Sequence, residues 1–490
     1  MNHLVLPVVL PLLAAFLMQP LARVSRLAAR VLGPVVLALC ALIILRLWLN
    51  YGGAPFVVAI GGFAPPLGIV LYADHLALIF ALAVPLFTLL FWPGLGDRSS
   101  DPGHGARRDA LVLLLAAAGT GLALSGDLFN IYVFYELAAV ASFGLASLSG
   151  TSRALVATLR YLLLSAFGSV LSLVGIAILY METGTLNLAD LARVAPHTLE
   201  GPLGLAAFAL MVIGFGVKAE LFPLNAWVPE VYATAPARVS ALLAGLVSKL
   251  AALVVLRLLV LVFHQPEASQ LLLALGVLTV LTGELAAWRA RDFPRMIAFS
   301  SIGQLGIVFI AFSIDGDIGL LAGIAVALHH LVAKSALFGL SVRWNGSLEA
   351  LAGAARTAPL AAGLYVLLAL SLIGVPPLPG FWAKILVLVG LVQGGSALEL
   401  LALIAILLVT AIEASYLFRV AVRLYQRGKS PPPGHAPWDL GVAMALGAVL
   451  LAATLGISPV ADALRSVARQ AGDAGLYVDT VFPKTVARKD

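Results

Sequence analysis

Apolar runs long enough to cross a membrane follow one another along almost the whole chain. A helix needs about 20 mainly apolar residues to span the hydrocarbon core of a bilayer, and by this measure the sequence predicts about 14 transmembrane helices. The expected spans are 3–20, 30–50, 70–93, 109–126, 128–149, 155–181, 203–223, 238–263, 270–288, 293–313, 317–341, 359–389, 396–424 and 437–456. Charged residues make up 11% of the chain, against roughly 25% in soluble domains. We therefore expect an all-α integral membrane protein.

The spans form one polytopic membrane domain, residues 1–459, followed by a polar tail, residues 460–490. An amphipathic stretch near Val460–Gln470 would place the tail on the outer surface or against a neighbour. Arginines concentrate in the odd-numbered connections, such as the three between residues 23 and 30. Under the positive-inside rule these connections are cytoplasmic, so both termini are expected outside.

The composition also excludes several classes of function. The net charge is +6, but the arginines lie in short loops rather than in a stripe that could bind nucleic acid. The single cysteine, Cys40, excludes an intramolecular disulfide and an iron–sulfur cluster ligated by this chain alone. A nucleotide-binding glycine motif is absent from the sequence. We expect no cofactor and no bound metal.

Ionisable side chains nevertheless occur inside several spans. Such a group at the bilayer centre costs roughly 2.5–3.5 kcal/mol on insertion scales, so it should face protein or water and find a partner. The deeply placed groups are Glu136, Lys218, Lys249, Lys334, Lys384 and Glu413. The alternative is a long side chain near a helix end whose charge reaches the interface. That alternative is strongest for arginines such as Arg160 and Arg257.

Prolines interrupt two of the spans close to a lysine. Pro223 follows Lys218 by five residues, and Pro376 and Pro377 precede Lys384. Proline removes a helical hydrogen bond and frees backbone groups, which is tolerated at membrane depth only where the break is buried or lines a wet cavity. Paired broken helices are typical of transporters built from inverted repeats. We expect two five-helix repeats, about 109–263 and 270–424, each with one broken helix.

Glu136 lies deep in its apolar span, and a lone buried carboxylate should be either protonated or paired with a cation. Lys218, on another helix, is the leading candidate for its partner. Asp127, at the expected start of the same helix as Glu136, is placed to cap exposed backbone N–H groups.

Two histidines and a lysine lie in the segment LHHLVAKSALF. His330 and Lys334 are four residues apart and share one helix face, while His329 points about 100° away. One helix offers a single ligand direction, which argues against a metal. A histidine beside a lysine is suited to passing protons, since its pKa lies nearest neutrality. Either histidine could instead be packed and satisfied.

Six collinear segments resemble a known family. They are FAPPLGIVLYADHLALIFAL (63–82), GDLFNIYVFYELAAVASFGLASL (126–148), FGVKAELFPLNAWVPEVYATAPARVSALLAGLVSK (215–249), RDFPRMIAFSSIGQLG (291–306), LHHLVAKSALF (328–338) and GVPPLPGFWAK (374–384). The chain resembles the antiporter-like subunits shared by Mrp-type multisubunit Na⁺/H⁺ antiporters, respiratory complex I and membrane-bound hydrogenases. The resemblance is greatest to the D subunits of Mrp-type antiporters.

The resemblance implies 14 helices, two inverted repeats and a polar axis along the membrane plane. In that family the residue matching Glu136 pairs with the lysine matching Lys218. The lysine matching Lys249 leads to His330 and Lys334, and the axis ends at Lys384.

Two positions depart from the family pattern. Glu220 stands where the family usually has a small residue, and Arg160 replaces a common lysine. On a continuous helix Glu220 would point away from Lys218, so it is expected to serve the loop or a partner subunit. Glu413, deep in the thirteenth span, is a candidate partner for Lys384.

Three functions remain open from the sequence. The first is a proton- and cation-translocating subunit of a multisubunit Na⁺/H⁺ antiporter in a prokaryotic plasma membrane. The second is a proton-pumping subunit of an NADH–quinone oxidoreductase or a membrane-bound hydrogenase. The third is a membrane protein whose buried charges only hold helices together. The first two imply partner membrane subunits, and the resemblance favours the first.

Overall fold

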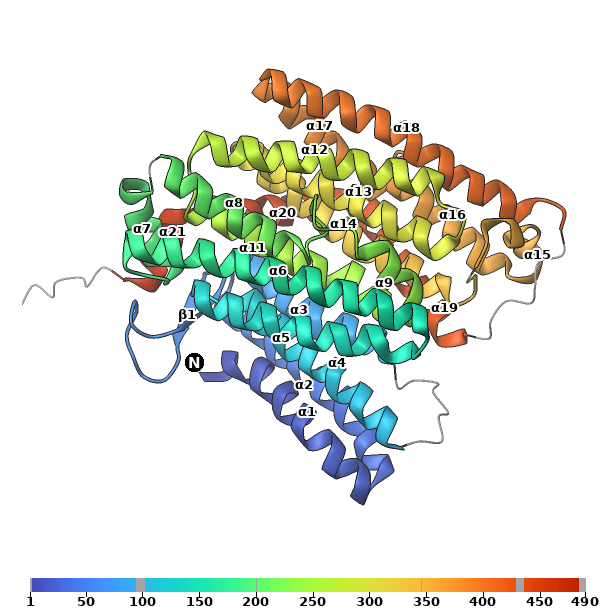
Figure 1. Cartoon of the computed structure of the whole chain (residues 1–490), viewed down its shortest axis with the longest axis horizontal. Helices are drawn as coiled ribbons and strands as arrows, with labels where there is room; N and C mark the ends of the chain where they lie inside the picture. The colour runs from blue at the N-terminus through green and yellow to red at the C-terminus, as the bar shows by residue number, and fades with distance from the viewer. Residues whose placement is uncertain (1, 94–101, 200, 345, 429–435, 484–490) are drawn as a thin grey trace, which may run out of the picture.

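The computed structural model describes residues 2–93, 102–199, 201–344, 346–428 and 436–483 as a bundle of helices (Figure 1). The helices are η1 (Asn2–Val5), α1 (Leu6–Val24), α2 (Arg26–Tyr51), α3 (His75–Leu90), α4 (Pro102–Leu124), α5 (Leu128–Ala146), η2 (Ser147–Ser149), α6 (Ser152–Thr183), α7 (Leu188–Thr198), α8 (Pro202–Gly216), α9 (Val228–Thr234), α10 (Ala237–Leu242), η3 (Leu243–Val247), α11 (Ser248–Leu261), α12 (Pro266–Arg289), α13 (Phe293–Phe312), α14 (Asp317–Ser341), η4 (Leu348–Leu351), α15 (Ala354–Thr357), α16 (Pro359–Ile373), α17 (Pro379–Gly394), α18 (Ala397–Tyr425), α19 (Pro437–Leu455), α20 (Ile457–Gly472) and α21 (Ala474–Val481).

The helical membrane architecture is confirmed. Within the described residues, 10 helices are long and apolar enough to cross a membrane, and four shorter apolar helices accompany them. Aspartates fix where several helices begin, because their carboxylates accept a backbone N–H three residues later. Asp74 caps α3 in this way, Asp127 caps α5 and Asp292 caps α13.

One expected helix start is wrong. The span predicted at 70–93 begins with a strand, β2 (Val70–Ala73), which pairs antiparallel with β1 (Phe56–Ala59). All four β2 residues are buried, and an apolar stretch this short does not distinguish a strand from a helix by its pattern. The helix proper, α3, starts only after the Asp74 cap.

Both predicted interruptions are present. α8 ends at Gly216 and helical structure resumes at α9, which leaves Lys218 and Pro223 between them. α16 ends at Ile373, and α17 begins at Pro379 after the Pro376–Pro377 segment. The equivalence of the two halves as inverted repeats, about 109–263 and 270–424, stays a prediction.

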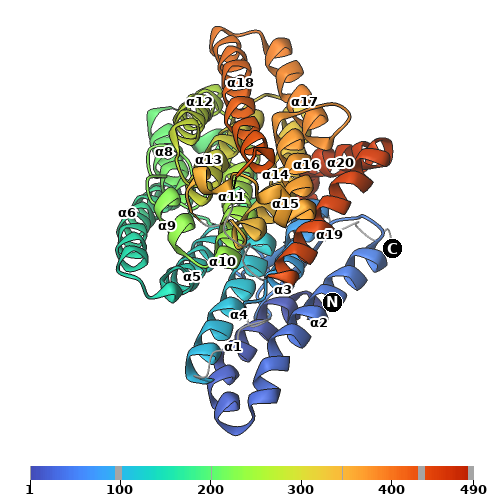
Figure 2. The same ribbon diagram turned by 90° about the vertical axis from the view of Figure 1, so that its right-hand side faces the viewer.

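Three helices form the centre of the bundle. The span from α10 through η3 to α11 is 100% buried over its most apolar window, and the corresponding windows of α13 and α14 are 89% and 83% buried. The η3 segment is a π-helical turn within this span. α1 and α2 lie at one edge of the molecule and α18 at the opposite edge (Figure 2). Polar groups on the central helices are therefore far from lipid.

The polar tail, as far as residue 483, packs back onto the bundle. α20 lies against α14 and α3, and α21 lies against α7. The Gln470 side chain accepts from the His75 backbone at 2.7 Å and donates to the Gly53 carbonyl at 2.8 Å. The rings of Tyr477 and Tyr72 stack at 3.8 Å. The amphipathic stretch expected near Val460–Gln470 is confirmed as the helix α20.

Candidate functional site

A row of buried ionisable side chains runs through the bundle. Each is at most 8% exposed, and the row comprises Lys218, Glu220, Lys249, Glu284, His329, His330, Lys334, Lys384 and Glu413. The row thus contains the four predicted lysines and both predicted histidines. Buried charges need partners, so the contacts of each member determine what the row can do.

Lys218 lies at the first break, and no carboxylate among the described residues is within ion-pair distance of it. Its ammonium lies 3.3 Å from the centroid of the Tyr135 ring and donates to the Ser165 hydroxyl at 3.3 Å. Glu136 is the carboxylate that acts on it electrostatically. One oxygen of Glu136 is buried and accepts no hydrogen bond from the described residues. The expected direct contact between Glu136 and Lys218 is therefore absent from this conformation, since the lysine lies on the aromatic ring instead.

Side chains satisfy the backbone freed by the first break. The Tyr135 hydroxyl lies 3.1 Å from the Gly214 carbonyl and 3.0 Å from the Phe215 carbonyl, so its one proton is shared between them. The Trp227 indole N–H donates to the Val217 carbonyl at 3.0 Å. Unpaired carbonyls at this depth would each be costly, so these aromatic residues stabilise the interruption.

Glu220 points into the row, which corrects the expectation that it serves the loop or a partner subunit. Its side chain is 0% exposed, and its Oε1 accepts from the Tyr232 hydroxyl at 2.8 Å and the Ser301 hydroxyl at 3.4 Å. The expectation failed because the helix stops at Gly216, after which helical spacing no longer applies. Glu220 has φ 59°, a left-handed conformation that costs a residue with a side chain about 1–2 kcal/mol.

Lys249 follows the π-helical turn η3. Its ammonium donates to the carbonyl of Ala244, within that turn, and to the Ser248 hydroxyl at 3.2 Å. A π-helical turn displaces carbonyls from the normal hydrogen-bond ladder, which explains why Ala244 can accept from a side chain. The carboxylate that acts on Lys249 is that of Glu220.

α14 carries the middle of the row. The Lys334 ammonium donates to the Ser300 hydroxyl at 2.5 Å. His330 is 0% exposed, and neither ring nitrogen has a hydrogen-bond partner among the described residues. His329 faces another direction, and its Nε2 lies 2.8 Å from the Ser371 hydroxyl. The two histidines therefore face different directions, as predicted. His329 has a hydrogen-bond partner on α16, whereas Lys249 and Lys334 act on His330.

Lys384 lies at the second break and is firmly paired. Its ammonium lies 2.6 Å from Glu413 Oε2 and 3.4 Å from the carbonyl of Ile373, the last residue of α16. Glu413 also accepts from the Gln304 amide at 2.6 Å. The expected Glu413 partner is confirmed as a contact.

Glu284 is a further member of the row that sequence reasoning missed. It is 1% exposed and accepts from the Tyr416 hydroxyl at 2.9 Å. Glu284, Glu413 and Glu220 are the carboxylates that act on Lys334. Glu284 lies only five residues from the end of α12, where a glutamate usually reaches water. The sequence did contain one indication that Glu284 is buried, because four apolar residues follow it before α12 ends at Arg289.

Groups of opposite charge act on one another within the row. Lys249 and Lys334 act on Glu220, Glu413 and Glu284 act on Lys334, and Lys384 acts on Glu284. Oxygens of Glu136, Glu220 and Glu284 and both nitrogens of His330 are buried without a hydrogen bond from the described part of the chain. Buried polar atoms of this kind are normally satisfied by internal water. The arrangement is suited to carrying protons along a hydrated row of charges.

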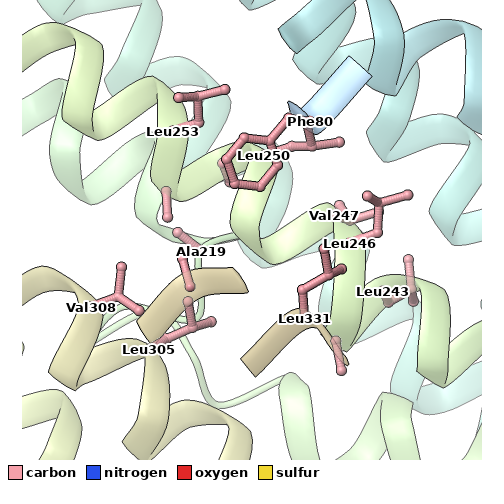
Figure 3. Packing of buried hydrophobic residues seen from close by; sticks show 14 of the residues in the cluster. Phe80, Ala219, Leu243, Leu246, Val247, Leu250, Leu253, Leu305, Val308 and Leu331 are labelled. Carbon is pink, nitrogen blue, oxygen red and sulfur yellow. The ribbon is translucent and has the colours of Figure 1, made fainter. Parts of the chain in front are cut away.

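Apolar side chains surround the centre of this row. Figure 3 shows residues from the π-helical turn and α11, such as Leu246 and Leu250, together with Phe80, Leu305 and Leu331. Ala219, the neighbour of Glu220, belongs to the same buried core. Such a shell lowers the local dielectric constant and strengthens the interactions between charges inside it.

Two predicted accessory residues lie outside the row. Asp127 caps α5 by accepting from the Asn130 backbone at 2.9 Å, and burial raises the pKa of its carboxyl. Arg160 is exposed on α6. Arg257, whose charge could have reached the interface, instead forms a buried 2.5 Å ion pair with Asp74. In the part of the chain that the structure describes, no three His, Cys, Asp or Glu residues are grouped as a metal site.

The chain is similar to curated membrane subunits over most of its length. It is 33% identical to the N subunit of the NADH-quinone oxidoreductase of Desulforudis audaxviator over 78% of each chain. It is 34% identical to the D subunit of the Na(+)/H(+) antiporter of Alkalihalophilus pseudofirmus, over 78% of this chain and 80% of the relative.

Solved structures share the fold. A chain of the membrane-bound sulfane sulfur reductase, an archaeal respiratory membrane complex, superposes with TM-score 0.91 at 28% identity, covering 98% of this chain and all of that one. A chain of the Mrp complex from Dietzia sp. DQ12-45-1b gives 0.87 at 25% identity and covers 98% of each. The family described as NADH:quinone oxidoreductase/Mrp antiporter, TM, matches residues 125–410, more than half of the sequence. The chain therefore belongs to this family of membrane subunits.

Proposed function

We propose that this protein is the proton-translocating subunit of a multisubunit Na⁺/H⁺ antiporter. The observation that carries the proposal is the row of buried charges that extends from the first broken helix to the second. Ionisable side chains rarely face lipid, because a charge there is costly. Where they occur inside a membrane domain, they normally mark an ion path. The relative from a Na(+)/H(+) antiporter, 34% identical over most of both chains, supports the choice of reaction.

The path in this proposal uses the residues that the row brings together. Protons move between Lys218, Lys249, His330, Lys334 and Lys384 through water, with Glu136 biasing the charge of Lys218 from outside ion-pair distance. Movement of Lys218 from the Tyr135 ring toward Glu136 would lower the energy of its charged form. Because the row runs across the bundle, this shift is transmitted to Lys249 as a change in electrostatic energy.

His329, Glu413, Pro223, Pro376 and Pro377 support the path. The breaks at the prolines open the helices toward the two sides, while Glu413 and His329 hold the second break in position. Na⁺ is exchanged by the whole complex, with partner membrane subunits, in a prokaryotic plasma membrane. Both termini lie outside, which a membrane-impermeant thiol reagent would test on cysteines introduced at either end.

Purification and transport together test this function. The complex isolated in mild detergent should contain further membrane subunits and no flavin or iron–sulfur protein. Everted vesicles that contain it should show Na⁺-dependent dequenching of a pH-sensitive dye. Co-purifying redox subunits, together with no response to Na⁺, would contradict the proposal.

A redox-driven proton pump is the second candidate. The high structural similarity to a chain of the sulfane sulfur reductase and the 33% identity to a chain of an NADH-quinone oxidoreductase favour it. In that case the same row would carry protons, and the driving reaction would lie in a partner.

A purely structural role for the charges predicts that Lys218→Ala lowers assembly and leaves transport by each assembled complex unchanged.

A further inference from the structure

Glu220 has no role in the path of lysines and histidine, yet it lies in the middle of the row. It is fully buried, and the groups that act on it electrostatically are Lys249 and Lys334. It comes from the irregular segment between α8 and α9, whereas the two lysines lie on α11 and α14. One side chain from the first broken helix thus reaches the junction of the two halves of the molecule.

The two oxygens of Glu220 have different surroundings. Oε1 accepts from the hydroxyls of Tyr232 and Ser301, which fixes the orientation of the carboxylate. Oε2 is buried and has no hydrogen-bond partner among the described residues. A carboxylate needed only to hold helices together would be expected to have both oxygens satisfied.

The backbone of Glu220 is also unusual. It is the one non-glycine residue with a positive φ in the described part of the chain. A strained backbone that persists at a buried polar site is typical of a position where the side chain is used. Asn225 stabilises this conformation by donating to the Glu220 carbonyl at 3.2 Å.

We propose that Glu220 is a proton-exchange site that connects Lys249 to Lys334. This inference rests on the proposed function, because it assumes that protons travel along the row. A proton leaves the Lys249 ammonium, through water, for Oε2 of the Glu220 carboxylate, which gives a neutral amine and a neutral carboxylic acid. The acid then passes the proton to a neutral Lys334 amine, and the carboxylate is regenerated.

The surrounding charges favour a proton over a metal cation at this position. Lys249 and Lys334 both act electrostatically on the carboxylate, and their ammonium groups would repel Na⁺. Lys334 also acts unfavourably on Lys249. A carboxylate that interacts with both lysines offsets the repulsion between their positive charges, and it accepts the Lys249 proton before the neutral Lys334 amine takes it up.

Two substitutions at Glu220 separate proton exchange from a structural role. In Glu220→Gln the amide oxygen still accepts from Tyr232 and Ser301, but the group no longer takes up a proton. Glu220→Asp keeps a titratable carboxyl on a shorter side chain. The assay is Na⁺-dependent proton movement in vesicles, normalised to the amount of assembled complex. Glu230→Gln is the matched control, because Glu230 follows on α9 and pairs with Arg295 at the surface at 3.0 Å.

We expect Glu220→Gln to slow transport at least about tenfold, Glu220→Asp to retain a measurable part of it, and Glu230→Gln to leave it unchanged. A Glu220→Gln complex that transports at the normal rate, while Lys218→Ala is inactive, would overturn this inference alone. Normal transport in both variants would overturn the proposed function as well.

Infrared spectroscopy keeps the inference testable if Glu220→Gln fails to assemble. The intact complex should show a carbonyl band of a protonated carboxyl that appears as pH falls and shifts in Glu220→Asp. Tyr232, Ser301, Lys249 and Lys334 are the groups that face Glu220 and set this band. A set of carboxyl bands identical in the wild-type and Glu220→Asp complexes would contradict proton uptake at Glu220.

Discussion

The two broken helices carry the same kind of charge in different settings. At the first break, the Lys218 ammonium lies 3.3 Å from an aromatic ring, and no described carboxylate is within ion-pair distance. At the second, Lys384 lies 2.6 Å from Glu413 and also donates to the carbonyl that ends α16. One lysine is held by weak contacts, and the other by a buried ion pair.

This difference distinguishes a lysine side chain that can move, Lys218, from one that is held in place, Lys384. Leaving a ring and a hydroxyl costs less than breaking a buried ion pair, whose loss leaves an uncompensated charge. Lys218 can therefore change its partner during transport, whereas Lys384 keeps the second break in one conformation. The backbone carbonyls at the two breaks also have different donors. Tyr135 and Trp227 donate to carbonyls at the first break, and Lys384 donates to a carbonyl at the second.

The largest expected change in stability is at the second break. Glu413→Ala leaves Lys384 buried and unpaired, so we expect a loss of about 3–5 kcal/mol of unfolding free energy. Glu230→Ala, which breaks a half-exposed pair with Arg295, should cost about 0–1 kcal/mol. Denaturation of the purified complex measures both. Equal stability of the two variants would show that the Lys384–Glu413 pair does not stabilise the second break.

A paired replacement sharpens this result. Lys384→Met combined with Glu413→Leu removes both charges, so its stability should recover most of the loss while transport stays low. If transport recovered together with stability, the charge of Lys384 would have no part in the path.

At the first break, removal of one hydroxyl should have a clear effect. Tyr135→Phe removes the hydroxyl donor of the Phe215 carbonyl and leaves the Gly214 carbonyl with the Val217 N–H at 3.3 Å, which we expect to lower the unfolding free energy by about 1–3 kcal/mol. Tyr180→Phe, on the exposed face of α6, is the matched control and should be neutral. A Tyr135→Phe variant as stable as the control would show that the first break does not depend on this aromatic residue.

Removal of the distant carboxylate should slow transport without stopping it. We expect Glu136→Ala to lower the rate of dye dequenching roughly tenfold, equivalent to about 1.4 kcal/mol in the barrier. The exposed Glu182 at the end of α6 provides a control, since Glu182→Ala should transport normally. Complete inactivity of Glu136→Ala would mean that Glu136 carries protons itself rather than biasing Lys218.

The smallest effect is expected at Arg160. It is exposed on α6 and outside the row, so Arg160→Ala should keep the transport rate within about twofold, as surface substitutions usually do. A loss as large as that of Glu136→Ala would bring Arg160 into the path.

Sequence reasoning succeeded where long apolar runs made a charge conspicuous. Lys218, Lys249 and Lys384 were visible because about 20 apolar residues surround each of them, and the prolines located both breaks. The pairing of Lys384 with Glu413 also followed from their depth. These features depend on local sequence, and therefore the sequence alone could indicate them.

The rest depended on backbone geometry and tertiary packing. Glu220 was misplaced because a left-handed residue after the end of α8 turns its side chain away from the helical direction. Glu284 was missed because it lies near the end of α12, where a glutamate usually reaches water. Lys218 lies on the Tyr135 ring rather than against Glu136, and no spacing rule distinguishes these two positions. The strand Val70–Ala73 is too short for its pattern to separate it from a helix.

Ion transport by Lys218→Ala tests the central claim most directly. The measurement is Na⁺-dependent dye dequenching in vesicles that contain equal amounts of the assembled wild-type and variant complexes. If the row of buried charges is the ion path, the variant assembles normally and loses transport. If Lys218→Ala assembles normally and exchanges ions at the wild-type rate, the row of buried charges is not the ion path.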